Sequence, residues 1–116
     1  MRKYPQIKIA VPDHVRGLIF DCDGTLVDSM PLHMKAWEYA VKHEGGVWDH
    51  EFFFSKCGMT EEDIIDLYNT RNPLHLNPVK TVQTKHEYFR RHRVECKPIM
   101  PVVDLVLRYR DVLPMA

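Results

Sequence analysis

The sequence predicts an α/β fold in which a block of helices is inserted after the first strand of a parallel sheet. Three observations lead to this prediction. The predicted strand at 16–21 contains a continuous apolar stretch, Leu18 to Phe20, of the kind found in a strand covered on both faces. Segments with helical spacing follow between residues 31 and 95. One more amphipathic helix and the start of another strand, at 112–116, then complete the pattern of a βα unit.

The first elements surround the predicted strand at 16–21. Residues 6–11 alternate only weakly and are predicted either as a short strand or as an irregular lead-in. Ser29 suits the N-cap of the first helix, and Pro31 suits its first turn. Gly45, with the glycine after it, is expected to end that helix.

The remaining helices are each bounded by a capping or breaking residue. Thr60 and Asp63 resemble a capping box, and Asn77 precedes a proline that suits a helical first turn. Residues 56–59 are predicted as a loop. The predicted helical ranges are 49–55, 60–71, 77–95 and 101–109.

Composition restricts the class of partner. Lysine and arginine number 16, as do aspartate and glutamate, so no overall field favours nucleic acid or a membrane. The basic run at 85–93 is expected to be a solvated helix face rather than a phosphate-binding patch. No apolar stretch is long enough to span a bilayer. Three cysteines without CxxC spacing predict a protein of the reducing cytoplasm.

The chemistry is concentrated where the predicted strand ends. Asp21 and Asp23 are two residues apart, so in an extended segment their carboxylates face the same side. Gly24 allows a sharp turn and a close approach of backbone to a ligand. Two neighbouring carboxylates repel each other unless a cation offsets their charge, and a hard divalent ion suits oxygen ligands. The competing interpretation is an Asx turn or a helix cap.

These residues carry a family resemblance. The run at 18–25 resembles the first motif of the haloacid dehalogenase (HAD) superfamily of phosphohydrolases. The likeness continues at 28–29, 31–33 and 35–37, in the manner of the branch that contains β-phosphoglucomutase and fructose-1-phosphate phosphatase-like enzymes. It covers residues 16–116 and is most specific at 18–37.

The resemblance implies a partial Rossmann-like core with an inserted all-helical cap. Residues 1–29 and 97–116 would belong to the core, and 30–96 to the cap. The family's three later motifs are not found in this sequence. We therefore expect an incomplete catalytic core, little or no turnover by the isolated chain, and self-association through apolar residues at 18–20 and 102–107.

The resemblance also implies a mechanism that uses Mg²⁺. Asp21 would be the nucleophile that attacks the phosphorus of a phosphorylated sugar. Asp23 would be the general acid and then the base. Both would hold the metal, Asp23 through its carbonyl oxygen. Backbone N–H groups from Cys22 to Gly24 would hold the phosphoryl group, while the Cys22 thiol is expected to be a buried core group rather than a catalytic one.

Further substrate contacts are implied in the cap. His33 shares a helix face with Trp37; it would touch substrate or order Asp23, or else it only packs on the tryptophan. The segment at 56–60 matches the family's cap specificity loop only through Gly58. Lys56 could reach a substrate from this loop, although a loop lysine is usually solvated.

Three functions remain open. A phosphatase is favoured over a phosphomutase, because Thr60, Glu61 and Glu62 stand where the mutases carry a basic residue that grips a second phosphate, and the two glutamates would repel that phosphate. The third alternative is a non-catalytic helical binding module.

Overall fold

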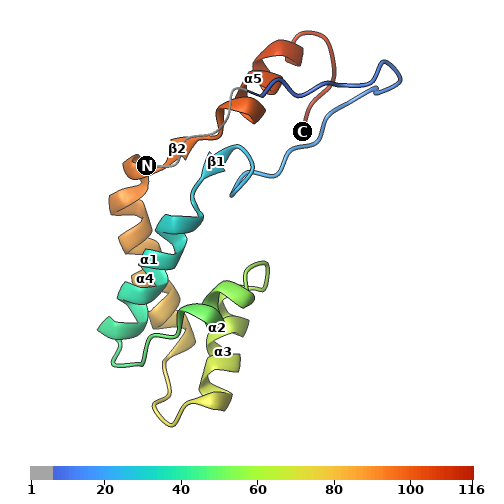
Figure 1. Cartoon of the computed structure of the whole chain (residues 1–116). Coiled ribbons are helices and arrows are strands. Elements are labelled where there is room, and N and C mark those ends of the chain that lie inside the picture. The colour runs from blue at the N-terminus through green and yellow to red at the C-terminus, as the bar shows by residue number, and fades with distance from the viewer. Residues whose placement is uncertain (1–6) are drawn as a thin grey trace. The chain divides into compact units, whose positions relative to one another are not determined.

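The computed structural model describes residues 7–116 and divides into two compact units (Figure 1). The first, called the terminal unit here, contains the described residues up to Met30 together with Cys96–Ala116. The second, called the helical unit, is Pro31–Glu95. No helix within 7–116 is long and apolar enough to cross a membrane.

The terminal unit holds a two-stranded antiparallel sheet. Strand β1 (Val27–Asp28) pairs with β2 (Lys97–Pro98). Helix α5 (Met100–Tyr109) follows β2 and has a proline in its first turn, as predicted. Because a two-residue strand has no measurable periodicity, the β1–β2 pair could not be predicted from the sequence pattern.

The predicted strand at 16–21 is wrong as a full strand. Only Leu18 forms a bridge there, parallel to Met115, with the Leu18 amide donating to the Pro114 carbonyl at 2.9 Å. The amide of Ala116 donates in turn to the carbonyl of Leu18 at 3.0 Å. The predicted strand start at 112–116 therefore supplies the bridge partner of Leu18. Ile19 is 89% exposed, so the expected cover on both faces is absent there.

Residues 7–11 form neither helix nor strand. This agrees with the irregular lead-in rather than with the short strand; residue 6 lies outside the described part of the chain.

The helical unit contains the helices predicted for it. They are α1 (Met30–His43), α2 (His50–Ser55), α3 (Glu61–Arg71) and α4 (Pro78–His92), followed by a 3₁₀ turn at Arg93–Glu95. Gly45 has a φ of +84° and ends α1, as expected. The Asn77 side chain caps α4 by accepting from the Lys80 amide at 2.9 Å. The predicted capping box at Thr60 is wrong, because Thr60 precedes α3 without a side-chain cap bond.

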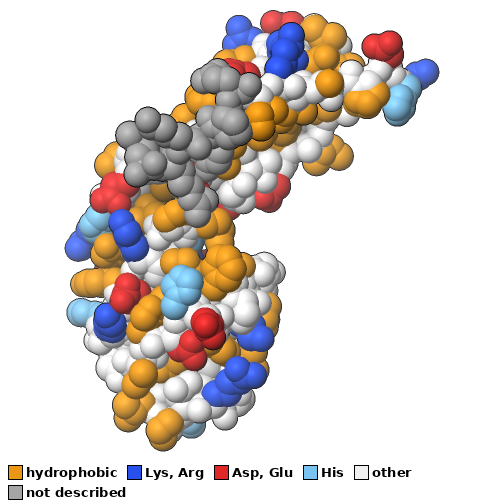
Figure 2. All heavy atoms as spheres, viewed as in Figure 1, with side chains coloured by type: hydrophobic (Ala, Val, Ile, Leu, Met, Phe, Trp, Pro, Cys, Tyr) orange, Lys and Arg blue, Asp and Glu red, His pale blue; other side chains and the backbone are white. Residues whose placement is uncertain are grey.

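Aromatic and aliphatic side chains fill the centre of the helical unit. Phe53 and Tyr68 are each 1% exposed and lie against each other with ring centroids 5.8 Å apart. The Tyr68 hydroxyl donates to the Val47 carbonyl at 2.9 Å and accepts from the Val47 amide at 2.8 Å. A buried phenol thus fastens the α1–α2 connection to α3. Figure 2 shows acidic and basic side chains interspersed on the visible face, in keeping with the balanced composition.

Replacing Tyr68 with phenylalanine should lower the free energy of unfolding by about 1–3 kcal/mol, because Val47 loses both partners for its backbone groups. Urea unfolding measures the difference. Tyr39→Phe is the control, since Tyr39 is 44% exposed. Equal stability of the Tyr68→Phe variant and the wild type would contradict this role for the hydroxyl.

Candidate active site

A tight loop follows Asp21. The Cys22 carbonyl accepts from the amides of Thr25, Leu26 and Val27 at 3.2, 2.9 and 3.2 Å. The Gly24 amide donates to the Val27 carbonyl at 2.8 Å, and Gly24 has a φ of +76°, which a side chain rarely tolerates. The turn predicted at Gly24 is therefore confirmed.

A hydroxyl group holds each carboxylate of the pair. Thr25 Oγ1 donates to Asp21 Oδ2 at 3.2 Å, and Ser29 Oγ donates to Asp23 Oδ1 at 2.6 Å. Asp21 and Asp23 are exposed, whereas Ser29 is only 1% exposed. A buried donor with little freedom thus orients the second carboxylate. Ser29 immediately precedes α1, at the position predicted for its N-cap.

The Cys22 thiol is exposed, so its prediction as a buried core group is wrong. That prediction depended on a fully covered strand, and the segment carries only the single bridge described above. The Cys22 backbone instead organises the turn through its carbonyl oxygen.

The donor set suits a hard divalent ion. Two exposed carboxylates offer oxygen ligands of the kind that Mg²⁺ prefers, and Mg²⁺ usually keeps several waters in its remaining positions. Among residues 7–116 no group of three or more His, Cys, Asp or Glu side chains is arranged around one metal position. An ion held by Asp21 and Asp23 would need further oxygen ligands, such as water or substrate oxygens.

His33, Lys56 and Gly58 all belong to the helical unit. The half-buried His33 ring stacks on Phe89, with centroids 4.3 Å apart, which the sequence did not indicate. Lys56 follows α2 and lies 5.8 Å from the centroid of the Phe52 ring. Gly58 has a φ of +101° in the loop that leads to α3.

An ion cluster lies where that loop enters α3. Glu61 accepts from Lys85 Nζ through Oε2 and contacts His86 Nε2 through Oε1, both at 2.7 Å. Lys85 is only 4% exposed, and its Nζ lies 4.8 Å from the centroid of the Trp37 ring. The expectation that residues 85–93 form a solvated face is therefore wrong for Lys85.

Burial alone would raise the pKa of Glu61. The hydrogen bonds and positive charges of Lys85 and His86 together outweigh this effect, so the pKa of Glu61 lies below its ordinary value of 4.5.

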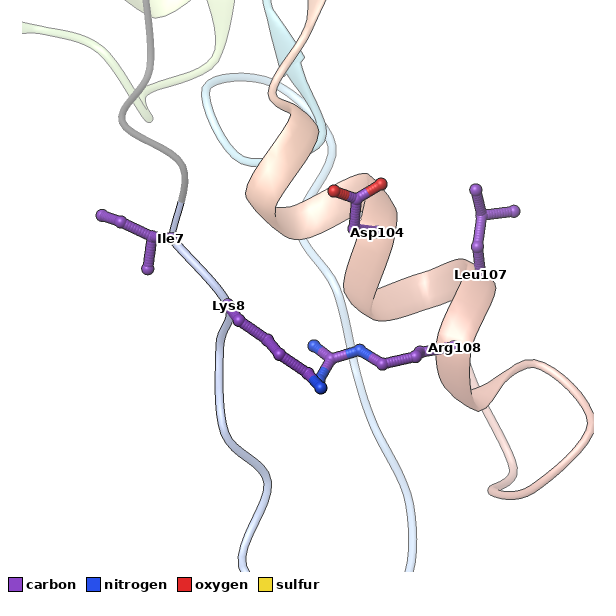
Figure 3. A pocket seen from close by; sticks show the side chains of 5 residues that line it. All are labelled: Ile7, Lys8, Asp104, Leu107 and Arg108. Atoms are coloured by element: carbon purple, nitrogen blue, oxygen red, sulfur yellow. The ribbon is translucent and has the colours of Figure 1, made fainter.

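A hollow of about 530 Å³ lies elsewhere in the terminal unit. Its lining is Ile7, Lys8, Asp104, Leu107 and Arg108 (Figure 3). Arg108 Nη2 donates to the Ile9 carbonyl at 2.8 Å and so ties α5 to the lead-in. The hollow contains neither carboxylate of the pair.

Comparison with known proteins places these features in a family. A family model described as haloacid dehalogenase-like hydrolase matches residues 15–109. The fructose-1-phosphate phosphatase YqaB of Escherichia coli is 32% identical over 100 residues, which is 86% of this chain and 53% of that protein. The β-phosphoglucomutase of Mycobacterium tuberculosis is 42% identical over 38 residues, covering 30% of this chain and 14% of that protein.

A solved structure also matches. The crystal structure of a hydrolase from Pseudomonas syringae has a TM-score of 0.73 and 20% identity, covering 87% of this chain and 47% of that one. The chain spans about half the length of the phosphatase and of this hydrolase. The predicted fold, a partial α/β core with a helical cap, is confirmed by this match.

The lowered pKa of Glu61 predicts a loss of stability in acid. A carboxylate whose folded-state pKa lies below its unfolded value stabilises the fold above about pH 4.5, and this contribution disappears as pH falls through the folded pKa. The free energy of unfolding of the wild type should therefore decline below that pH. The difference between this free energy and that of the Glu61→Gln variant should shrink. Urea unfolding from about pH 7 to about pH 3 tests this. A difference that stays constant with pH would contradict it.

Proposed function

The chain belongs to the haloacid dehalogenase-like hydrolases, and on this premise we propose that it carries the nucleophile loop of a magnesium-dependent phosphatase for a small sugar phosphate such as fructose 1-phosphate. The observation that carries the proposal is the segment at 21–27, in which the exposed carboxylates of Asp21 and Asp23 each accept a hydrogen bond from a hydroxyl group.

Asp21 is proposed as the nucleophile. Thr25 holds Oδ2, which leaves Oδ1 to attack the phosphorus. The new bond joins this oxygen to phosphorus as the bond to the sugar oxygen breaks, giving an aspartyl phosphate and an alkoxide that takes a proton. Backbone amides of Cys22 and Asp23 are the proposed donors to the phosphoryl oxygens, since the Gly24 amide of this loop donates to the Val27 carbonyl. Bound Mg²⁺ would offset the repulsion between carboxylate and phosphate.

Asp23 is proposed as the general acid and base. It would protonate the departing alkoxide and then remove a proton from the water that attacks the aspartyl phosphate, releasing inorganic phosphate and restoring Asp21. The short hydrogen bond from the buried Ser29 limits rotation of this carboxyl group, which supports its role in a directed proton transfer.

The helical unit is proposed as the cap. The chain divides after Met30 and before Cys96, within one residue of the proposed boundaries at 29/30 and 96/97. His33, Lys56 and Gly58 would contact the sugar phosphate from this unit. The resemblance of 86% of the chain to a phosphatase supports hydrolysis over phosphoryl transfer to a second sugar hydroxyl.

Two further properties belong to this proposal. Because Asp21 and Asp23 are exposed to water, which weakens electrostatic stabilisation, turnover by the 116-residue chain should be low. The free cysteines fit a cytoplasmic protein.

Phosphate release tests the proposal. With Mg²⁺ and fructose 1-phosphate, the wild-type chain should release phosphate slowly, and Asp21→Asn should abolish this release. Asp111→Asn, at an exposed position, is the control. Release that survives Asp21→Asn would contradict the assignment of the nucleophile. An isomerised sugar phosphate in place of free sugar would indicate a mutase.

Self-association is expected because Ile19 is 89% and Leu107 is 53% exposed. Sedimentation velocity should give a mass above 13.7 kDa that falls when Ile19 is replaced by serine. Val79→Ser, at a 58% exposed position of the helical unit, is the control. A mass of 13.7 kDa at every concentration would be incompatible with this expectation.

A further inference from the structure

We propose that Glu61 is a positioning residue that, through Lys85 and His86 of α4, fixes the loop at 56–60 in the shape that receives the substrate. The inference rests on the proposed function for the substrate role of this loop. The clamp itself is argued from contacts within the helical unit.

The loop is fastened at its beginning by backbone bonds. The amides of Lys56 and Cys57 donate to the carbonyls of Phe53 and Phe54 at 3.2 and 3.4 Å, which continues the end of α2. The Met59 amide then donates to the Lys56 carbonyl at 3.1 Å, closing a turn that contains Gly58. These bonds determine where the loop starts and how it turns.

The far end of the loop has little packing of its own. All residues at 57–60 are exposed, so no buried side chain anchors them. Thr60 makes no side-chain bond to the first turn of α3. Glu61, the first residue of α3, is therefore the nearest side chain that ties this end to another helix.

The tie is rigid because its cationic partner is buried. Lys85 is 4% exposed, its ammonium lies over Trp37, and it donates a hydrogen bond to Glu61. Without this carboxylate the buried ammonium would have no opposite charge beside it, so pairing with Glu61 is strongly favoured. His86 holds the second carboxylate oxygen, and the two bonds together fix both the position and the rotation of the Glu61 side chain.

Amide hydrogen exchange by NMR on the 116-residue chain tests the clamp. In Glu61→Gln the amides of Cys57 and Met59 should exchange at least about tenfold faster, the equivalent of one lost hydrogen bond. The amide of Gly46, bonded to the Val41 carbonyl at 2.8 Å in the same unit, reports on the fold and should change little. Glu62→Gln, one residue away and exposed, is the matched control.

Two further variants keep the test decisive if Glu61→Gln unfolds. Lys85→Met with Glu61→Gln removes both charges, so no unpaired ion is left at the buried position. This double variant should remain folded with a fast-exchanging loop. Lys85→Arg keeps the charge and should preserve slow exchange. Loop exchange unchanged in a folded double variant would overturn the clamp.

Fructose 1-phosphate with Mg²⁺ separates the clamp from the proposed function. If both hold, the sugar phosphate slows loop exchange in the wild type and does so at several-fold higher concentration in the double variant. If the variants loosen the loop but the sugar phosphate leaves wild-type exchange unchanged, the clamp stands and the substrate role of the loop is overturned.

Discussion

The central constraint is the placement of two like charges at the start of one tight loop. Asp21 and Asp23 carry like charges that repel each other, so without hydrogen-bond donors their side chains would have no fixed orientation. The structure supplies a hydroxyl donor to each, and the carbonyl of Cys22 gathers three amides that bring Thr25 within reach of Asp21. Gly24 makes this turn possible through its positive φ. The same turn leads into β1 and to the buried Ser29.

The helical unit solves an analogous problem by other means. Lys85 is a buried cation, and removing the carboxylate that pairs with a buried cation leaves its charge uncompensated. Glu61 and the Trp37 face compensate it, and Glu61 can do so because α3 and α4 pack together. The Glu61–Lys85 ion pair therefore connects the beginning of α3, where the loop at 56–60 ends, to α4.

Sequence patterns predicted the helices well because their signals are local. Asn77 caps α4, and Gly45 ends α1, through bonds and backbone angles within one helical turn. The sequence therefore predicts both helix ends correctly. The strand at 16–21 was overestimated, because a ladder depends on neighbours that periodicity does not reveal. The exposure of Cys22 was missed for the same reason.

Contacts between distant residues were also beyond the sequence. Lys85 meets Glu61 across 24 positions, and nothing in a basic run distinguishes the one lysine that turns inward. The hydrogen bond from Thr25 to Asp21 could have been predicted from the sequence, because the two residues are four positions apart and Gly24 indicates a turn between them.

Binding of beryllium trifluoride, an analogue of a phosphoryl group, tests the central claim most directly. With Mg²⁺ present, fluorine NMR of the wild-type chain should show a bound signal that Asp21→Asn abolishes and that Thr25→Val weakens, because the oriented carboxylate oxygen coordinates the beryllium. No bound signal in the wild type, or an undiminished signal in Asp21→Asn, would contradict the account.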